Sequence, residues 1–212
     1  VTNRDTKYEI TVKANSTNTT YDGQSHTAEG VETTTFEVDG NTYTVSGLKT
    51  ENPVKTDAGT YTNNITGTAV VKDAAENDVT SQFTVKTENG NLVISKRNVT
   101  LTSASDSRVY NGKPLTNKNV TVGGEGFATG EGATYNVTGS QTVAGSSENT
   151  FTYTLNKGTK ADNYTITTSK GTLTVTNRDT KYEITVKANS TDRKSTRLNS
   201  SHIQKSRMPS SA

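Results

Sequence analysis

The first seventeen residues of the chain return letter for letter near its end: residues 1–17 and residues 175–191 both read VTNRDTKYEITVKANST, at an offset of 174. A fold requires only that the apolar pattern and the turn residues be repeated, which leaves most surface positions free to vary. Identity over this length therefore exceeds what structure demands. It predicts that the chain is a window from a tandem array, which starts inside one repeat and extends over one full period.

The residues after Thr191 do not continue the array. A third copy would proceed as residues 18–21 do, but residues 192–202 read DRKSTRLNSSH. This string resembles the in-frame translation of a common short-read sequencing adapter, and residues 206–212 resemble the next constant part of that adapter. We therefore interpret residues 192–212 as an artefactual, disordered tail and the sequence as a metagenomic fragment.

Setting the tail aside reverses the net charge. The whole chain has 23 basic and 21 acidic residues, but the tail holds five basic residues and one acidic residue, which leaves 18 against 20. The formal charge of +2 becomes −2, so the sequence does not indicate the basic surface that nucleic acid or an anionic membrane would require. Nucleic acid is not an expected partner, and no apolar run reaches membrane-spanning length.

Apolar residues alternate with polar residues in many short segments. Residues 8–14 and 151–155 each place apolar side chains at every second position, with Thr or charged residues between them. This period of two is typical of half-buried β-strands. Asp39-Gly40 and Asn89-Gly90 each lie between two such segments and predict hairpin turns, because those dipeptides tolerate positive φ. No segment shows helical spacing with caps, so almost no helix is expected.

A weaker repeat divides each period into two related halves. A Tyr-x-Gly motif follows the first strand of each half, Ala-Gly precedes a later strand, and a Gly opens the last strand. The motif residues are Tyr21 and Tyr110, Gly23 and Gly112, Gly59 and Gly145, and Gly90 and Gly171. Each half has the size of a single β-sandwich. The predicted divisions are 1–5 for the end of a preceding repeat, 6–96 for domain A, 97–177 for domain B and 178–191 for the first strand of a truncated third domain.

These motifs, together with Asn-Tyr-Thr-Ile-Thr-Thr and Gly-Thr-Leu-Thr-Val within residues 163–175, resemble the Ig-like MBG repeats of bacterial surface proteins. The match covers nearly all of domain B, whereas domain A has Gln82-Phe83 in place of Asn-Tyr and a longer insert at residues 72–79. The resemblance implies an all-β fold of two tandem Ig-like β-sandwich domains, in a cell-surface or cell-wall array that is often from Gram-positive bacteria. A β-grasp-like fold is the alternative, but it needs a crossover helix that neither half supplies.

The two identical segments are predicted to differ in burial. Later strands of domain A should cover Tyr8, Ile10 and Val12. The second copy has no such partners, and an isolated strand cannot offset the backbone entropy of ordering it. Tyr182, Ile184 and Val186 should therefore be exposed.

Residues for catalysis are scarce. The chain has no Cys and, outside the tail, a single His, so a Cys-His site is excluded and a Ser-His-Asp site would have to use His26. A solvated loop His is the expected role. The Gly-rich stretches at residues 123–126 and 130–132 lack the Lys and the helix of a phosphate loop. No enzymatic activity, catalytic residue or cofactor is expected.

Two further groups of residues are candidate sites. Asp73, Glu76 and Asp78 are a weak candidate for binding Ca²⁺, because their spacing lacks the pattern of a calcium loop. Tyr21 and Tyr110 could stack on a sugar. We instead expect each ring to cover the edge of its sandwich with its hydroxyl bonded to the backbone, as in a tyrosine corner.

The sequence favours a structural stalk repeat of a bacterial secreted or cell-wall-anchored surface protein, which extends and presents a distal functional domain. Its expected partners are the neighbouring repeats of the same chain. The alternative is an adhesin module that binds a host glycan or protein through its loops. Loops such as residues 33–35 and 145–147 contain only Thr, Gly and Ser, which offer little to anchor a partner. Both hypotheses place the protein outside the cell.

Overall fold

The computed structural model describes residues 6–189. Within this range the chain forms β-strands and two single-turn 3-10 helices, η1 and η2, but no α-helix, which confirms the all-β prediction. The predicted preceding-repeat end, residues 1–5, and the predicted tail, residues 192–212, lie outside the described residues. The chain divides into two compact units, one ending at Arg178 and the other starting at Asp179.

The first ten strands fall within the predicted range of domain A. They are β1 (Tyr8–Lys13), β2 (Thr17–Thr20), β3 (His26–Thr27), β4 (Thr35–Val38), β5 (Asn41–Thr50), β6 (Val54–Lys55), β7 (Gly59–Asn63), β8 (Ile65–Asp73), β9 (Phe83–Glu88) and β10 (Gly90–Ser95), with η1 (Thr80–Gln82) before β9.

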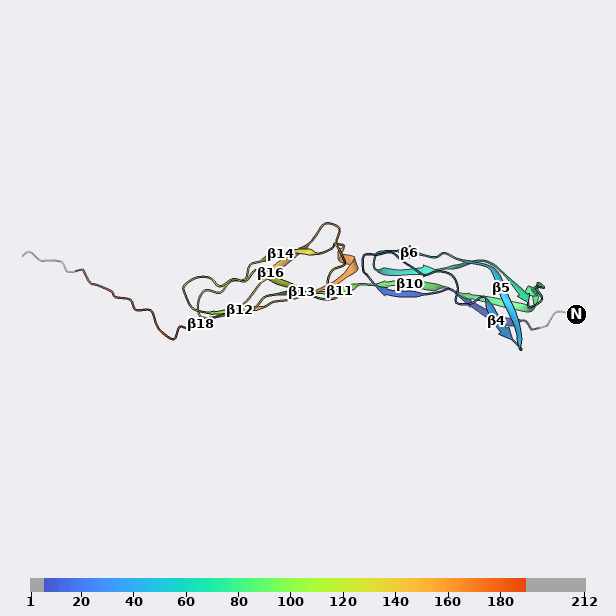
Figure 1. Ribbon diagram of the computed structural model, residues 1–212, viewed down its shortest axis with the longest axis horizontal. Coiled ribbons are helices and arrows are strands. Elements are labelled where there is room, and N and C mark those ends of the chain that lie inside the picture. The colour runs from blue at the N-terminus through green and yellow to red at the C-terminus, as the bar shows by residue number, and fades with distance from the viewer. Residues whose placement is uncertain (1–5, 190–212) are drawn as a thin grey trace, which may run out of the picture. The chain divides into compact units, whose positions relative to one another are not determined.

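The other eight strands fall within the predicted range of domain B. They are β11 (Arg97–Ser103), β12 (Asp106–Val109), β13 (Val120–Gly124), β14 (Ala133–Val137), β15 (Gly145–Glu148), β16 (Phe151–Leu155), β17 (Tyr164–Ser169) and β18 (Thr172–Thr176), with η2 (Ala161–Asn163) before β17. Only Lys96 separates β10 from β11, so the last strand of domain A leads directly into domain B (Figure 1).

The two domains share one pattern of strand pairing. The first strand pairs in parallel with the penultimate strand, as β1 with β9 and β11 with β17. The second strand pairs in parallel with the last, as β2 with β10 and β12 with β18. The last strand also pairs antiparallel with β7 or β15, which places Gly59 opposite Ile94 and Gly145 opposite Val175. These registers relate positions in domain A to positions in domain B one by one.

Strand pairing stays within each domain. In domain A the remaining sheets are β3–β6 and β4–β5–β8, and in domain B β13 adds to β11 while β14 pairs with β16. Among residues 6–189, no strand of domain A pairs with a strand of domain B. The non-covalent contacts between the domains are therefore made by side chains and loops.

One of the two predicted hairpins is confirmed and the other is wrong. Asp39 and Gly40 have φ of 49° and 75° and join the antiparallel strands β4 and β5, as a two-residue hairpin requires. Asn89 and Gly90 instead connect strands of different sheets, because β9 pairs with β1 whereas β10 pairs with β2 and β7. Gly90 is needed for another reason. A Cβ at Gly90 would lie 2.2 Å from the backbone oxygen of Asn15.

A buried Asn lies at the same close approach of two backbone segments in both domains. The Asn63 amide nitrogen donates to the backbone oxygen of Asn15 at 3.2 Å, and that of Asn149 donates to the backbone oxygen of Ala104 at 2.9 Å. Both Asn side chains are fully buried. A Cβ at Gly171 would lie 2.4 Å from the same Ala104 oxygen, as the one at Gly90 would from Asn15. In each domain, one glycine thus allows a close approach of two backbone segments, and one buried Asn amide bonds to the approaching backbone oxygen.

Each domain has an apolar core of its own at the end away from the other domain. In domain A its buried members are Ile10, Val12, Val45, Val71 and Phe83. In domain B they are Leu115, Leu173 and Val175, with Tyr110 packed against them.

The identical segments differ in burial as predicted. Ile10 is 6% exposed and Ile184 is 85% exposed, although both follow the same preceding residues. Val12 is buried and Val186 is exposed, while Tyr8 is half-buried rather than fully covered. The same sequence is thus buried in one copy and exposed in the other, because only the first copy pairs with β9.

Replacing Gly90 with Ala is expected to destabilise the chain by about 1–3 kcal/mol, because the new methyl group meets a backbone oxygen that cannot move aside. Gly123→Ala is the matched control, since its nearest neighbours would lie 3.8 Å away, in ordinary contact. Chemical denaturation of both variants measures the difference. Equal stabilities would contradict the close approach.

Amide hydrogen exchange should separate the two identical segments. The amides of residues 8–13 lie in the β1–β9 ladder and should exchange slowly, whereas those of residues 182–187, which are in no strand, should exchange near the rate of an unfolded peptide. Equal protection in both copies would contradict the difference in pairing.

Candidate functional site: the joint between the domains

The largest group of buried apolar residues lies across the joint. Domain A contributes Tyr21, Ala28, Leu92 and Ile94, and domain B contributes Val99, Leu101, Ala128 and Tyr164. The rings of Tyr21 and Tyr164 meet edge to face, with centroids 5.5 Å apart. Domain interfaces within one chain are usually polar and allow relative motion. Here the domains share a continuous core, which opposes bending at the joint.

A single carboxylate links the two rings. The Tyr21 hydroxyl donates to one oxygen of Glu131, and the Tyr164 hydroxyl donates to the other at 2.9 Å. The Tyr164 hydroxyl also accepts the backbone N–H of Ala128 at 3.0 Å. Glu131 lies in a loop between two glycines, so the loop can bring its side chain over the joint. Both carboxylate oxygens have a donor, which satisfies a partly buried charge.

The buried environment changes the acidity of both tyrosines. Burial, followed by the nearby Glu131 carboxylate, raises the pKa of Tyr21 to about 12. Burial is also the main reason that the pKa of Tyr164 rises to about 12, with Glu131 adding to it. Both hydroxyls therefore stay protonated and act as donors at neutral pH.

Arg97 fastens the start of domain B to both sides of the joint. Its guanidinium donates to the backbone oxygens of Glu125 at 2.7 Å and Gly126 at 2.8 Å, and also to that of Tyr21 in domain A at 3.3 Å. A planar guanidinium can serve three acceptors at once, which an ammonium on a flexible stem does less well. Arg97 thus holds in place the short segment through which β10 continues into β11.

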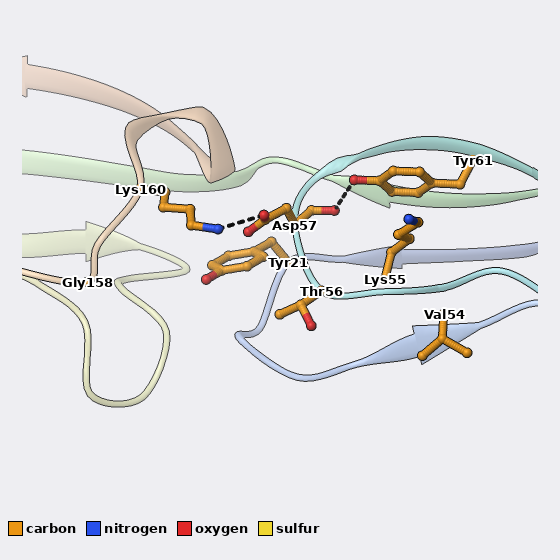
Figure 2. Close-up of a pocket in the computed structure, with 8 residues that line it drawn as sticks. All are labelled: Tyr21, Val54, Lys55, Thr56, Asp57, Tyr61, Gly158 and Lys160. Carbon is orange, nitrogen blue, oxygen red and sulfur yellow. Dashed lines mark hydrogen bonds and ion pairs between the residues drawn. The ribbon is translucent and has the colours of Figure 1, made fainter.

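A polar contact beside Tyr21 also links the two domains (Figure 2). The Lys160 ammonium lies 2.7 Å from an Asp57 oxygen, and the buried Asn163 amide donates to the other Asp57 oxygen at 3.0 Å. The Asn163 side-chain oxygen accepts the backbone N–H of Ala58 at 2.8 Å. The exposed ion pair contributes little by itself. The Asn163 bonds count for more, because that side chain is buried.

The same contact changes the acidity of both charged side chains. Hydrogen bonding to Lys160, and then to Asn163, lowers the pKa of Asp57, and the bond to Asp57 raises the pKa of Lys160. Each partner is therefore held in its charged form.

An open cleft of about 560 Å³ lies beside this contact. Figure 2 shows its lining residues, which are Tyr21, Val54, Lys55, Thr56, Asp57, Tyr61, Gly158 and Lys160. Neither ring is free to stack on a ligand. Tyr21 is only 4% exposed, and the Lys55 ammonium lies 5.3 Å from the centre of the Tyr61 ring. The cleft therefore does not offer the stacking platform that a sugar site requires.

The structure corrects the expectation of a tyrosine corner at Tyr21. Its hydroxyl bonds to the carboxylate of Glu131 in the other domain and not to nearby backbone. The backbone of the motif does follow one pattern in both domains. The N–H of Tyr21 donates to Ser95 and that of Tyr110 to Thr176, both at 2.9 Å, and the following Gly23 and Gly112 have φ of 82° and 77°. Gly59 and Gly145 begin β7 and β15.

The sole His of the described residues has a structural setting. His26 lies on the short strand β3 rather than in a loop, and its Nε2 is 2.9 Å from a carboxylate oxygen of Asp22. The neighbouring Ser25 hydroxyl contacts Thr56 at 3.2 Å, so Ser, His and Asp do not form a relay. The N–H of Gln24 and then His26 lower the pKa of Asp22, as in an Asx turn.

The three acidic residues weighed for Ca²⁺ serve the turn after β8. Asp73 accepts the backbone N–H groups of Ala75 and Asn77, each at 2.9 Å, and Asp78 accepts that of Thr80 at 2.9 Å. Glu76 is 3.0 Å from the Lys72 ammonium. Within residues 6–189 no group of three His, Cys, Asp or Glu is placed to hold a metal ion.

No protein-family model, no curated protein and no solved structure matches this chain. In the described part of the chain, no helix has the length and the apolar character needed to cross a membrane.

Sequence reasoning found Tyr21 and the glycines but missed the residues that complete the joint. Glu131, Arg97, Asp57, Lys160 and Asn163 bond across distances in sequence of up to 110 residues, for example from Tyr21 to Glu131. The one available signal was the place of Arg97 directly at the domain boundary. A Glu between two glycines carries no pattern that a single sequence reveals.

The joint should weaken at alkaline pH. Because both tyrosines have a folded-state pKa of about 12 against a usual value of 10, their stabilisation is fully present below pH 10 and is lost as the pH rises through about 12. The expected loss is on the order of 1–3 kcal/mol for each ring. Denaturation at a series of pH values measures it.

Two variants provide the controls for this pH dependence. Tyr164→Phe should flatten the alkaline slope, whereas Tyr153→Phe, at an exposed position on β16, should leave it unchanged. Identical slopes in both variants would show that the buried rings are not responsible.

Proposed function

We propose that this chain is a structural stalk repeat of a bacterial secreted or cell-wall-anchored surface protein, in which it extends and presents a distal functional domain. The resemblance to MBG-type Ig-like repeats and the letter-for-letter repeat at an offset of 174 both support an array. The observation that carries the proposal is the core shared by domains A and B. A spacer must keep its length, and a joint filled with side chains keeps it.

The direct passage between the domains supports the same function. One residue, Lys96, separates β10 from β11, and Arg97 is bonded to loops on both sides of the joint. A linker this short and this well fixed leaves little freedom to bend. Strands of about six residues with a rise of about 3.3 Å per residue, together with the loops at both ends, give roughly 35–40 Å for each domain and about 70–80 Å for each repeat.

The adhesin alternative has weaker support. The cleft at the joint has a buried Tyr21 ring, a Tyr61 ring with the Lys55 ammonium over it, and an Asp57 that is paired with Lys160. Binding hot spots usually consist of accessible aromatic or Arg side chains. An adhesin would thus have to bind through side chains outside this cleft.

Small-angle X-ray scattering tests the stalk directly. The A–B pair, residues 6–178, should scatter as a stiff rod with a maximum dimension of about 70–80 Å. Tyr21→Ser should make the joint bend, whereas Tyr153→Ser, on an exposed strand face of domain B, should not. A compact profile, or equal profiles for the two variants, would contradict the proposal.

A further inference from the structure

The far end of domain B presents apolar side chains where domain A presents a charge. Val143 lies two residues before Gly145, as Asp57 lies two residues before Gly59, and both glycines pair with the last strand of their domain. Val143 is 65% exposed. Val109 nearby is also exposed, and Tyr110, which occupies the position of Tyr21, is half-buried. This end therefore lacks the cover that Tyr21 receives from domain B.

The near end of domain A is apolar at the matching position. Val79 is the N-cap residue of η1, and Lys160 is the N-cap residue of η2. Phe83 follows η1 as Tyr164 follows η2, and the rings of Tyr8 and Tyr43 lie 5.5 Å and 4.7 Å from that of Phe83. Where domain B offers an ammonium to Asp57, domain A thus offers a half-buried Val that packs against its own aromatic cluster.

We propose that the far end of domain B is a docking surface for the near end of a second copy of domain A, with a Val143–Val79 contact in place of the Asp57–Lys160 ion pair. This inference rests on the proposed stalk function. The occupant is identified by the sequence that follows β18, since residues 175–191 repeat residues 1–17, the segment that contains β1 of domain A.

The joint between domains A and B supplies the geometry for this second joint. Tyr110 would pack against the half-buried rings of Tyr8 and Tyr43, which lie beside the buried Phe83 of the next copy, as Tyr21 packs against Tyr164. Gln82, the last residue of η1, corresponds to Asn163, the last residue of η2, and would accept the backbone N–H of Ala144. Each contact in the new joint has a counterpart in the one that the structure contains.

The exchange of an ion pair for an apolar pair also means that the two kinds of joint are not interchangeable. If domain A followed another domain A, Asp57 would face Val79, and a carboxylate would lose its water without gaining a partner. If domain B followed another domain B, Val143 would face the Lys160 ammonium. Only the alternating order, which the sequence fixes covalently, satisfies both ends.

The test uses an extended chain in which residues 18–96 follow Thr191 again. In the A–B joint the Ala58 amide is bonded to Asn163, so its hydrogen exchange reports on that joint. In the extended chain the Ala144 amide should exchange roughly tenfold more slowly than in the present chain, as expected for an amide that gains a bond in a closed joint. The methyl resonances of Val143 should shift as well.

Three variants of the extended chain make the test specific. Val143→Asp should abolish the protection of Ala144, and adding Val79→Lys in the second copy of domain A should restore it by recreating the ion pair. Val122→Asp, at an exposed Val in β13 away from this end, is the matched control and should change nothing. Thermal unfolding of Val143→Asp in the unextended chain checks that domain B still folds.

The outcomes separate this inference from the stalk proposal. Unchanged Ala144 exchange with a protected Ala58 amide would overturn the second joint and leave a stalk that is stiff within each A–B pair only. Failure of Val79→Lys to restore protection would overturn the proposed contact. An unprotected Ala58 amide would instead contradict the stiff A–B joint on which the stalk function depends.

Discussion

The arrangement of the two domains depends on one buried contact, in which the rings of Tyr21 and Tyr164 meet over a carboxylate. Glu131 accepts a hydroxyl from each domain, so the apolar core around the rings can close without leaving a polar group unpaired. Removing the carboxylate would leave two buried hydroxyls in need of acceptors, and removing either ring would open the core. The contact therefore joins burial and hydrogen bonding in a way that neither domain achieves alone.

The same pair of residue types, a glycine and a buried Asn, packs the inside of each domain. A glycine opens the last strand so that the backbone of Asn15 or Ala104 can approach it, and a buried Asn then satisfies the oxygen of that backbone. This leaves the ends of each sandwich free to vary. The ends have indeed varied, since one joint uses Asp57 and Lys160 while the exposed end of domain B has Val143.

The sequence predicted the all-β fold because alternation with a period of two is a local property of a strand. It also predicted the Asp39-Gly40 hairpin, whose two residues adopt positive φ by themselves. The hairpin prediction was wrong at Asn89-Gly90, where a similar dipeptide connects strands of two different sheets. The need for Gly90 comes from Asn15, a residue 75 positions away, and such distant causes leave no local signal.

The parallel pairing of terminal strands decides how a domain responds when it is pulled. The chain enters domain A through β1 and leaves through β10, and β1 is bonded to β9 over six residue pairs, from Tyr8 with Phe83 to Lys13 with Glu88. Tension along the chain would slide these strands past each other, so all bonds of the ladder carry the load together. Antiparallel neighbours joined by a hairpin would instead unzip one bond at a time. Resistance to stretching in this fold is therefore set by topology, and it can be high even where thermal stability is modest.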